Sequence, residues 1–274
     1  MALELFYITN NPDIAKIAEK NTVDRIWVDL ETRGKEERQN GMNTVKSNHV
    51  MSDVSTIREA ISGKSQLMVR VNSLYENSKS EIDEVIKRGA DIVMLPYFNT
   101  ADEAKRFVGY VDGRAKSCLL VETKQAQENL EEIVTSAGMD EVHIGLNDLH
   151  LQHNLKFMFE LLSNGTVEKM AKVLKDNNVK FGFGGIAKLD EGLLPARYIV
   201  SEHYRLGSSM AILSRSFYDS WISTDLEEID RAFKYGVGEI RDYEKRLMHE
   251  STEYFDINKE KVARMVGTIV NGKK

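Results

Sequence analysis

Two short apolar runs in this chain each lead into a carboxylate. Residues 119–121 are followed by Glu122, and residues 144–146 are followed by Asn147 and Asp148. Both runs have the composition of β-strands, and one strand–helix unit separates them. In a barrel of parallel strands the C-terminal strand ends meet at one mouth, so Glu122 and Asp148 are expected side by side there. Two carboxylates in that position suit a hard divalent cation.

Each of these carboxylates also has a simpler interpretation. Glu122 could form a salt bridge with a neighbour at the barrel mouth. Asp148 could cap the helix that follows, because Asn and Asp are common N-cap residues. The two residues on consecutive strand ends favour an ion site more strongly than either residue alone.

A basic residue and two further acidic residues end other strand-like runs. Arg70 closes an apolar run, and a guanidinium deep in a barrel needs an anion to offset its desolvation. Its forked donors suit a carboxylate, which is either that of a substrate or that of Glu31 or Glu122. Asp29 and Glu31 end an earlier run and share one face of it. One of them is expected to orient Arg70 or a catalytic water, while the other caps the loop.

The histidines do not have the spacing of a zinc site. The chain contains six of them: His49, His143, His150, His153, His203 and His249. No pair has the spacing of metal ligands on one helix, so Mg²⁺ or Mn²⁺ is preferred to zinc. His150 and His153 follow Asp148 closely and could act as acid or base, but a position on the helix surface is the stronger expectation.

Two glycine-containing segments and two basic residues could meet an anionic substrate group. Residues 182–186 and 206–210 are expected to end the seventh and eighth strands, where backbone N–H groups can hold a phosphate. Packing is the more common reason for such glycines. Lys35 and Arg38 lie in a segment that is most simply a solvated loop and helix start, although either could contact a substrate tail.

Short apolar runs alternate with longer amphipathic stretches along most of the chain. The expected helices include residues 80–88, with Ser80 as N-cap and Gly89 as stop, and residues 101–108 and 166–177. This alternation predicts an α/β fold, a (β/α)₈ TIM barrel with extra C-terminal helices. The eight expected strands are residues 5–9, 25–30, 66–71, 91–95, 117–122, 141–146, 180–184 and 204–207.

The pattern changes near the C-terminus. Residues 226–247 and 259–270 read as helices with no strand between them. We therefore predict a catalytic barrel over residues 1–218, followed by a helical extension over residues 219–274. This extension is expected to pack on the barrel or on a neighbouring subunit.

The composition excludes several other classes of protein. The 274 residues carry a net charge of −6, so nothing indicates a nucleic-acid partner. No apolar run is long enough to span a membrane, and the N-terminus lacks the features of a signal peptide. Cys118 is the single cysteine, which excludes an internal disulfide or a thiolate cage. A cytoplasmic enzyme is the default expectation.

Several of these motifs together resemble a known family. The segments VETKQAQENLEEI (residues 121–133) and VHIGLNDL (residues 142–149) are similar to those of class II 2-keto-acid aldolases and citrate lyase β subunits. These proteins belong to the phosphoenolpyruvate/pyruvate barrel superfamily. VRVN at residues 69–72 and LP at residues 95–96 match further family motifs, and VDLE at residues 28–31 is closer to the citrate-lyase branch.

The resemblance implies a set of roles. Glu122 and Asp148 would bind Mg²⁺ or Mn²⁺, and Arg70 would stabilise an enolate oxygen or hold a carboxylate. The substrate would be a small 2-oxo-acid such as pyruvate, whose carbonyl a divalent cation polarises. Family habit also suggests a homo-oligomer.

The sequence departs from both branches of the family. Thr32 stands where the aldolases usually carry a histidine and where the citrate lyases carry an aspartate. Tyr97 and Phe98 follow the LP motif, where the citrate-lyase branch commonly has a lysine. We therefore expect a divergent member, a metal-dependent carbon–carbon lyase in which Glu31 or Asp29 orients a catalytic water. The alternatives are a CoA-ester lyase of the citrate-lyase type and a barrel that binds a keto-acid or sugar acid without catalysis.

Overall fold

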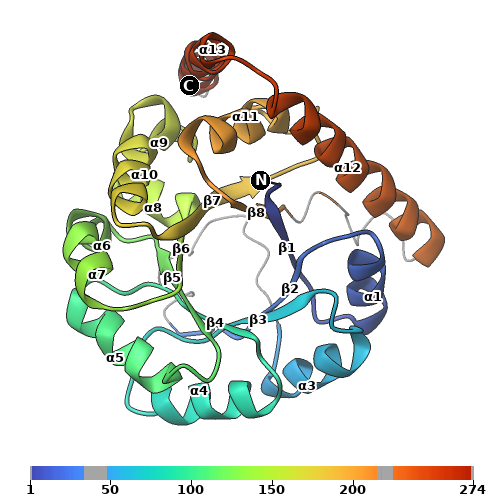
Figure 1. Cartoon of the computed structure of the whole chain (residues 1–274), viewed down its shortest axis with the longest axis vertical. Coiled ribbons are helices and arrows are strands. Elements are labelled where there is room, and N and C mark those ends of the chain that lie inside the picture. Colours follow the sequence, from blue (N-terminus) through green and yellow to red (C-terminus); the bar gives the residue numbers. More distant parts are fainter. Residues whose placement is uncertain (1, 34–47, 215–216, 218–224, 273–274) are drawn as a thin grey trace.

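The computed structural model describes residues 2–33, 48–214, 217 and 225–272 of the chain. Its eight parallel strands form a closed barrel in which each strand pairs with the next and β8 pairs with β1 (Figure 1). The predicted (β/α)₈ barrel is confirmed. The strands are β1 (Glu4–Ile8), β2 (Arg25–Asp29), β3 (Gln66–Arg70), β4 (Ile92–Leu95), β5 (Lys116–Val121), β6 (Glu141–Ile144), β7 (Lys180–Ile186) and β8 (Met210–Leu213).

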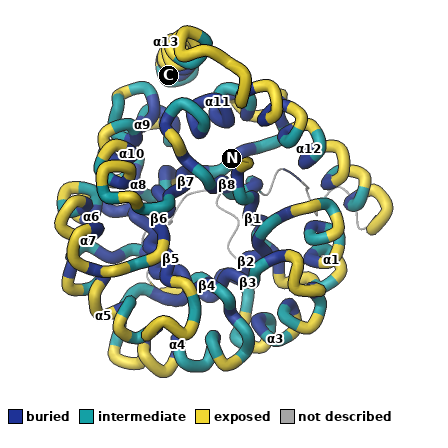
Figure 2. Tube along the Cα trace, viewed as in Figure 1, coloured by how far each residue is buried: buried dark blue, intermediate teal, exposed yellow. Residues whose placement is uncertain are grey.

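Helices surround the barrel, with buried residues toward the strands and exposed residues toward solvent (Figure 2). In the described part of the chain they are α1 (Pro12–Lys20), α3 (Met51–Ala60), α4 (Ser78–Lys87), α5 (Ala101–Val111), α6 (Lys124–Glu128), α7 (Leu130–Ser136), α8 (Leu146–Gln152), α9 (Glu160–Ser163), α10 (Thr166–Asp176), α11 (Ala196–Leu206), α12 (Leu226–Leu247) and α13 (Thr252–Gly272). No described helix is long and apolar enough to cross a bilayer.

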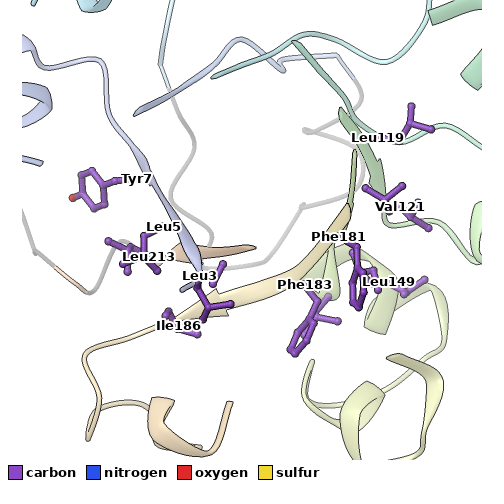
Figure 3. Packing of buried hydrophobic residues seen from close by; sticks show 14 of the residues in the cluster. Leu3, Leu5, Tyr7, Leu119, Val121, Leu149, Phe181, Phe183, Ile186 and Leu213 are labelled. Carbon is purple, nitrogen blue, oxygen red and sulfur yellow. The ribbon is translucent and has the colours of Figure 1, made fainter. Parts of the chain in front are cut away.

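Strand alternation divides the core into two layers. Even-numbered positions of β5, such as Cys118 and Leu120, belong to a cluster that fills the barrel interior together with Trp27, Met68 and other side chains. The positions between them pack outward against the helices. Figure 3 shows Leu119 and Val121 on this outer layer, where they point away from the barrel axis.

The same alternation carries polar residues into the interior at both ends of a strand. On β2 the inward side chains are Arg25 at the N-terminal end, Trp27 in the middle and Asp29 at the C-terminal end. All three are buried. The floor and the mouth of the barrel are therefore charged, whereas the middle layer is apolar.

The eighth strand was predicted in the wrong place. Residues 204–206 form the last turn of α11, and Gly207 ends that helix with a φ of 76° in the left-handed region. A short run with Tyr and Leu fits a buried helix end as well as a strand, so its composition could not decide between them. The strand begins at Met210, after a turn that glycine permits.

The predicted cap of α4 is also wrong. That helix begins at Ser78, with Asn77 in the N-cap position, so Ser80 lies inside its first turn. Gly89 follows the helix with a φ of 97°, in agreement with its predicted role as a stop. Three other predicted helices agree with α5, α10 and α12 to within a few residues. The predicted helix 259–270 lies within α13, which begins seven residues earlier, at Thr252.

The two C-terminal helices pack on the barrel in different ways. α12 lies against α1 and α11, in the position of the eighth helix of the ring (Figure 1). α13 lies outside that ring, against α11 and α9. The predicted boundary between residues 218 and 219 falls outside the described residues and stays a prediction.

Candidate active site

Arg70 and Asp29 meet at the C-terminal ends of β3 and β2. They are register partners in this pair of parallel strands. The Arg70 side chain donates from Nε to Asp29 Oδ1 over 2.8 Å and from Nη2 to Asp29 Oδ2 over 2.9 Å. This is the bidentate arrangement in which a guanidinium binds a carboxylate most firmly. The sequence predicted that either Asp29 or Glu31 orients Arg70 or a catalytic water, and in the structure both carboxylates contact Arg70.

Two further side chains hold Arg70 in this position. Glu31 Oε2 lies 3.3 Å from Nη2, which is one of the two ion pairs that the sequence offered for Arg70. The Trp27 ring lies beneath the guanidinium, with 4.9 Å between its centroid and Cζ. Cation–π contact of this kind favours a fixed guanidinium plane.

The charge of Arg70 is set by the acidic groups around it. Burial alone would lower the pKa of Arg70, but the charges of Asp29, Glu31 and Glu122 raise it above the ordinary value of an arginine. Arg70 therefore stays charged at every relevant pH. The three carboxylate residues are all buried, and the most exposed of them, Glu122, has a relative exposure of 3%. Among the residues that the structure describes, these three carboxylates act on the Arg70 guanidinium.

Glu122 follows β5 and is fixed by two backbone segments. The Tyr97 N–H donates to Glu122 Oε1 over 3.1 Å. Tyr97 adopts a φ of 46°, which is costly for a residue other than glycine and turns the chain after β4. On the other side lies Gly145, where an added Cβ would come within 2.9 Å of Glu122 Oε2. The carboxylate is thus seated in a close-fitting position.

Asp148 lies in the first turn of α8, three residues after Gly145. Gly145 is the N-cap of this helix, so the interpretation of Asp148 as its N-cap is wrong. Asp148 is half-buried, in contrast to Glu122. Within the described residues no group of three His, Cys, Asp or Glu side chains is arranged to hold a metal ion. The assignment of Glu122 and Asp148 as ligands stays a prediction.

The donor set at the mouth nevertheless fits a hard divalent cation. Glu122 and Asp148 offer carboxylate oxygens, the ligands that Mg²⁺ and Mn²⁺ prefer. If the metal is present, Glu122 and Asp148 are the residues that would hold it.

Most histidines lie away from Arg70. His153 Nε2 contacts Gln127 Oε1 at 2.7 Å, and His150 Nδ1 contacts the Leu146 carbonyl oxygen of its own helix at 3.2 Å. His150 lies in the last turn of α8 and His153 is its C-cap, and both are half-buried, so the expected surface position at a helix start is wrong. Burial lowers the pKa of His143 to about 4 and that of His203 to about 3, so both are neutral packing residues at pH 7.

His49 is the histidine that contacts the charged cluster. Its Nδ1 accepts the backbone N–H of Asp29 over 3.0 Å, across 20 residues of sequence. In the neutral ring this bond places the proton on Nε2. No local sequence motif points to His49, because it is 20 residues from Asp29 in the sequence and meets β2 only in the folded chain.

The predicted anion contacts have different outcomes. Residues 206–210 lie before β8, at the end of the strand opposite the mouth, so a phosphate cradle there is wrong. Gly184 and Gly185 lie within β7, beside a register irregularity, and their proposed role stays a prediction. Lys35 and Arg38 lie outside the described residues.

The structure is a (β/α)₈ barrel with charged side chains at the C-terminal mouth, which is the place where enzymes of this fold carry their active sites. A family model described as HpcH/HpaI aldolase/citrate lyase matches residues 3–158. The chain belongs to the HpcH/HpaI aldolase/citrate lyase family.

Solved structures have the same fold at low sequence identity. An HpcH/HpaI aldolase from Desulfitobacterium hafniense DCB-2 matches with a TM-score of 0.60 and 15% identity, over 78% of this chain and 86% of that one. An HpcH/HpaI aldolase/citrate lyase family protein from Burkholderia cenocepacia J2315 also matches with a TM-score of 0.60 and 15% identity. That match covers 88% of this chain and 95% of the other.

Proposed function

We propose that this chain is a divalent-metal-dependent carbon–carbon lyase or aldolase acting on a small 2-oxo-acid such as pyruvate. The observation that carries the proposal is the buried cluster of Arg70 with three carboxylates at the ends of β2, β3 and β5. Membership of an aldolase and citrate lyase family supports the reaction class.

Arg70 has two roles in this proposal, binding of the substrate and stabilisation of the enolate charge. Arg70, held by Asp29 on one edge, directs its remaining N–H groups to a substrate carboxylate or enolate oxygen. When the bond beside the ketone breaks, its electron pair becomes the enolate, and this guanidinium offsets the new charge. Bound Mg²⁺ or Mn²⁺ would polarise the ketone oxygen.

Proton transfer is assigned to the acidic residues beside Arg70. Glu31 or Asp29 orients a water molecule, which carries a proton to or from the substrate. Glu31 is better suited, because its contact with Arg70, at 3.3 Å, is longer than the two contacts of Asp29, at 2.8 and 2.9 Å. The apolar layer beneath, which includes Trp27 and Leu120, closes the mouth to water from the barrel interior.

The proposal is tested by exchange of the pyruvate methyl protons for deuterium, followed by proton NMR. We expect exchange with Mg²⁺ or Mn²⁺ and none after chelation. Glu122→Gln should abolish exchange and weaken Mn²⁺ binding, measured by paramagnetic relaxation, without unfolding the chain. Glu128→Gln, at an exposed position on α6, is the matched control. A Glu122→Gln protein with normal turnover would refute the assignment.

A further inference from the structure

The side chain of Asn72 links two segments of the mouth. Asn72 follows Arg70 by two residues, beyond the end of β3. Its Oδ1 accepts the backbone N–H of Thr32 over 2.9 Å and that of Arg33 over 3.0 Å, across 40 and 39 residues of sequence. Thr32 and Arg33 directly follow Glu31. One carboxamide therefore joins the segment that carries Arg70 to the segment that carries Glu31.

These contacts begin where the backbone pairing stops. The N–H of Leu30 donates to the Arg70 carbonyl oxygen over 2.9 Å, and this is the last backbone bond between the two segments in the described residues. Beyond it, the Asn72 side chain receives the next N–H groups. It prolongs the pairing of β2 and β3 past the strand ends and holds the backbone of Thr32 and Arg33 beside Asn72.

A buried glutamate on α4 fixes the orientation of the carboxamide. Asn72 Nδ2 donates to Glu81 Oε1 over 2.7 Å, and the Asn72 backbone N–H reaches the same oxygen at 3.3 Å. Glu81 is 9% exposed, and burial raises the pKa of its carboxyl group. The amide nitrogen must face the carboxyl group, so the amide oxygen must face the loop.

Glu31 directly precedes the two residues whose N–H groups donate to Asn72. Glu31 lies beyond β2, and its contact with Arg70 is longer than that of Asp29, at 3.3 Å. A carboxylate that orients water must be held to a fraction of an ångström. We propose that Asn72 is a positioning residue for the reaction, which acts through Glu31, with Glu81 setting its orientation. This inference rests on the proposed function.

The contact itself is tested without any activity measurement. Hydrogen exchange followed by NMR reports the Thr32 and Arg33 amides directly. Asn72→Ala should speed the exchange of both by about tenfold, because each loses its acceptor. Unchanged exchange of the two amides would overturn the proposal.

The effect on chemistry is tested by a double-mutant cycle. Asn72→Ala should lower kcat for pyruvate deuterium exchange by about 10- to 100-fold with little change in KM, because Arg70 still holds the substrate. In a Glu31→Gln background the same substitution should cost less than about twofold. A loss of equal size in both backgrounds would show a general structural effect and overturn the inference.

A pair of substitutions that exchanges the amide and the carboxylate between residues 72 and 81 keeps the test valid if Asn72→Ala does not fold. Asn72→Asp places a second carboxylate against Glu81, and adding Glu81→Gln restores a donor to the pair. The double variant should recover to within about threefold of the wild-type kcat. A double variant that folds and is no better than Asn72→Asp would overturn the assigned role of Glu81.

The matched control is Asn258, another buried asparagine that donates to a glutamate. Its Nδ2 contacts Glu202 Oε1 over 2.9 Å, on α13 and α11. Asn258→Ala should lower stability but leave kcat unchanged. Wild-type protein that exchanges no pyruvate protons would refute the proposed function. Active wild-type protein with an unaffected Asn72→Ala variant would refute only this inference.

Discussion

Asp29 and Arg70 are register partners on neighbouring strands, and their side chains meet in a bidentate ion pair at the barrel mouth. Because both side chains point inward at the same height, the sheet itself sets the geometry of the pair. The guanidinium is therefore fixed before any substrate arrives. Pre-organised donors of this kind are the most effective way to stabilise a developing negative charge.

Arg70→Lys should lower the rate of pyruvate deuterium exchange by about 10²- to 10³-fold. Lysine keeps the charge but cannot form the two-pronged pair with Asp29 or stack on Trp27 as a plane. The measurement is kcat at saturating Mg²⁺, with circular dichroism as the control for folding. A rate within threefold of wild type would contradict the role given to the guanidinium.

Gly145→Ala should impair the reaction without straining the backbone. The φ of Gly145 is −81°, which alanine adopts freely, but its Cβ would lie 2.8 Å from Glu122 Cβ. The carboxylate must move, so Mn²⁺ affinity should fall by about tenfold or more. Gly109→Ala, where no atom lies within 4 Å of the new Cβ, is the control. Equal Mn²⁺ affinity in both variants would argue against Glu122 as a ligand.

Stability should fall as the pH decreases from about 6.5 towards 4. The pKa of His143 is lowered to about 4 and that of His203 to about 3, whereas an unfolded histidine titrates near 6.5. In this range the unfolded chain binds more protons than the folded one. Each group therefore contributes a slope of up to about 1.4 kcal/mol per pH unit.

This pH effect is measured by urea unfolding at several pH values. His143→Gln should reduce the slope of the unfolding free energy between pH 5 and 6 by the contribution of one histidine, up to about 1.4 kcal/mol per pH unit. His249→Gln, at an exposed position after α12, should leave it unchanged. Equal slopes in wild type and His143→Gln would show that the ring is not held neutral by the fold.

Glu141→Gln should destabilise the chain without changing the chemistry. Arg25 is fully buried at the barrel floor, where Nη2 donates to Glu141 Oε2 over 2.9 Å and Glu4 also binds the guanidinium. Loss of one partner of a buried pair costs about 3–5 kcal/mol. Thermal unfolding should show this loss, and the folded protein should keep its kcat. A changed kcat would show that the floor and the mouth are coupled.

The sequence by itself determined the barrel and the elements that carry the site. Alternating apolar runs and amphipathic stretches predicted seven strands near their observed places. Carboxylates and an arginine at strand ends predicted which face would hold the chemistry, because parallel strands in a barrel all end at one mouth. Only the short run at residues 204–207 was assigned to the wrong element, since burial makes a helix end and a strand look alike.

The partners at the mouth were decided by the tertiary structure. Register pairs Arg70 with Asp29, and loop packing brings His49 to the Asp29 backbone and Asn72 to Thr32 and Arg33. These contacts join residues 20 to 41 positions apart, and no spacing rule links them. Strand patterns specify which way a side chain points, but only the closed barrel sets which side chains meet, because register and loop path depend on the packing of the whole chain.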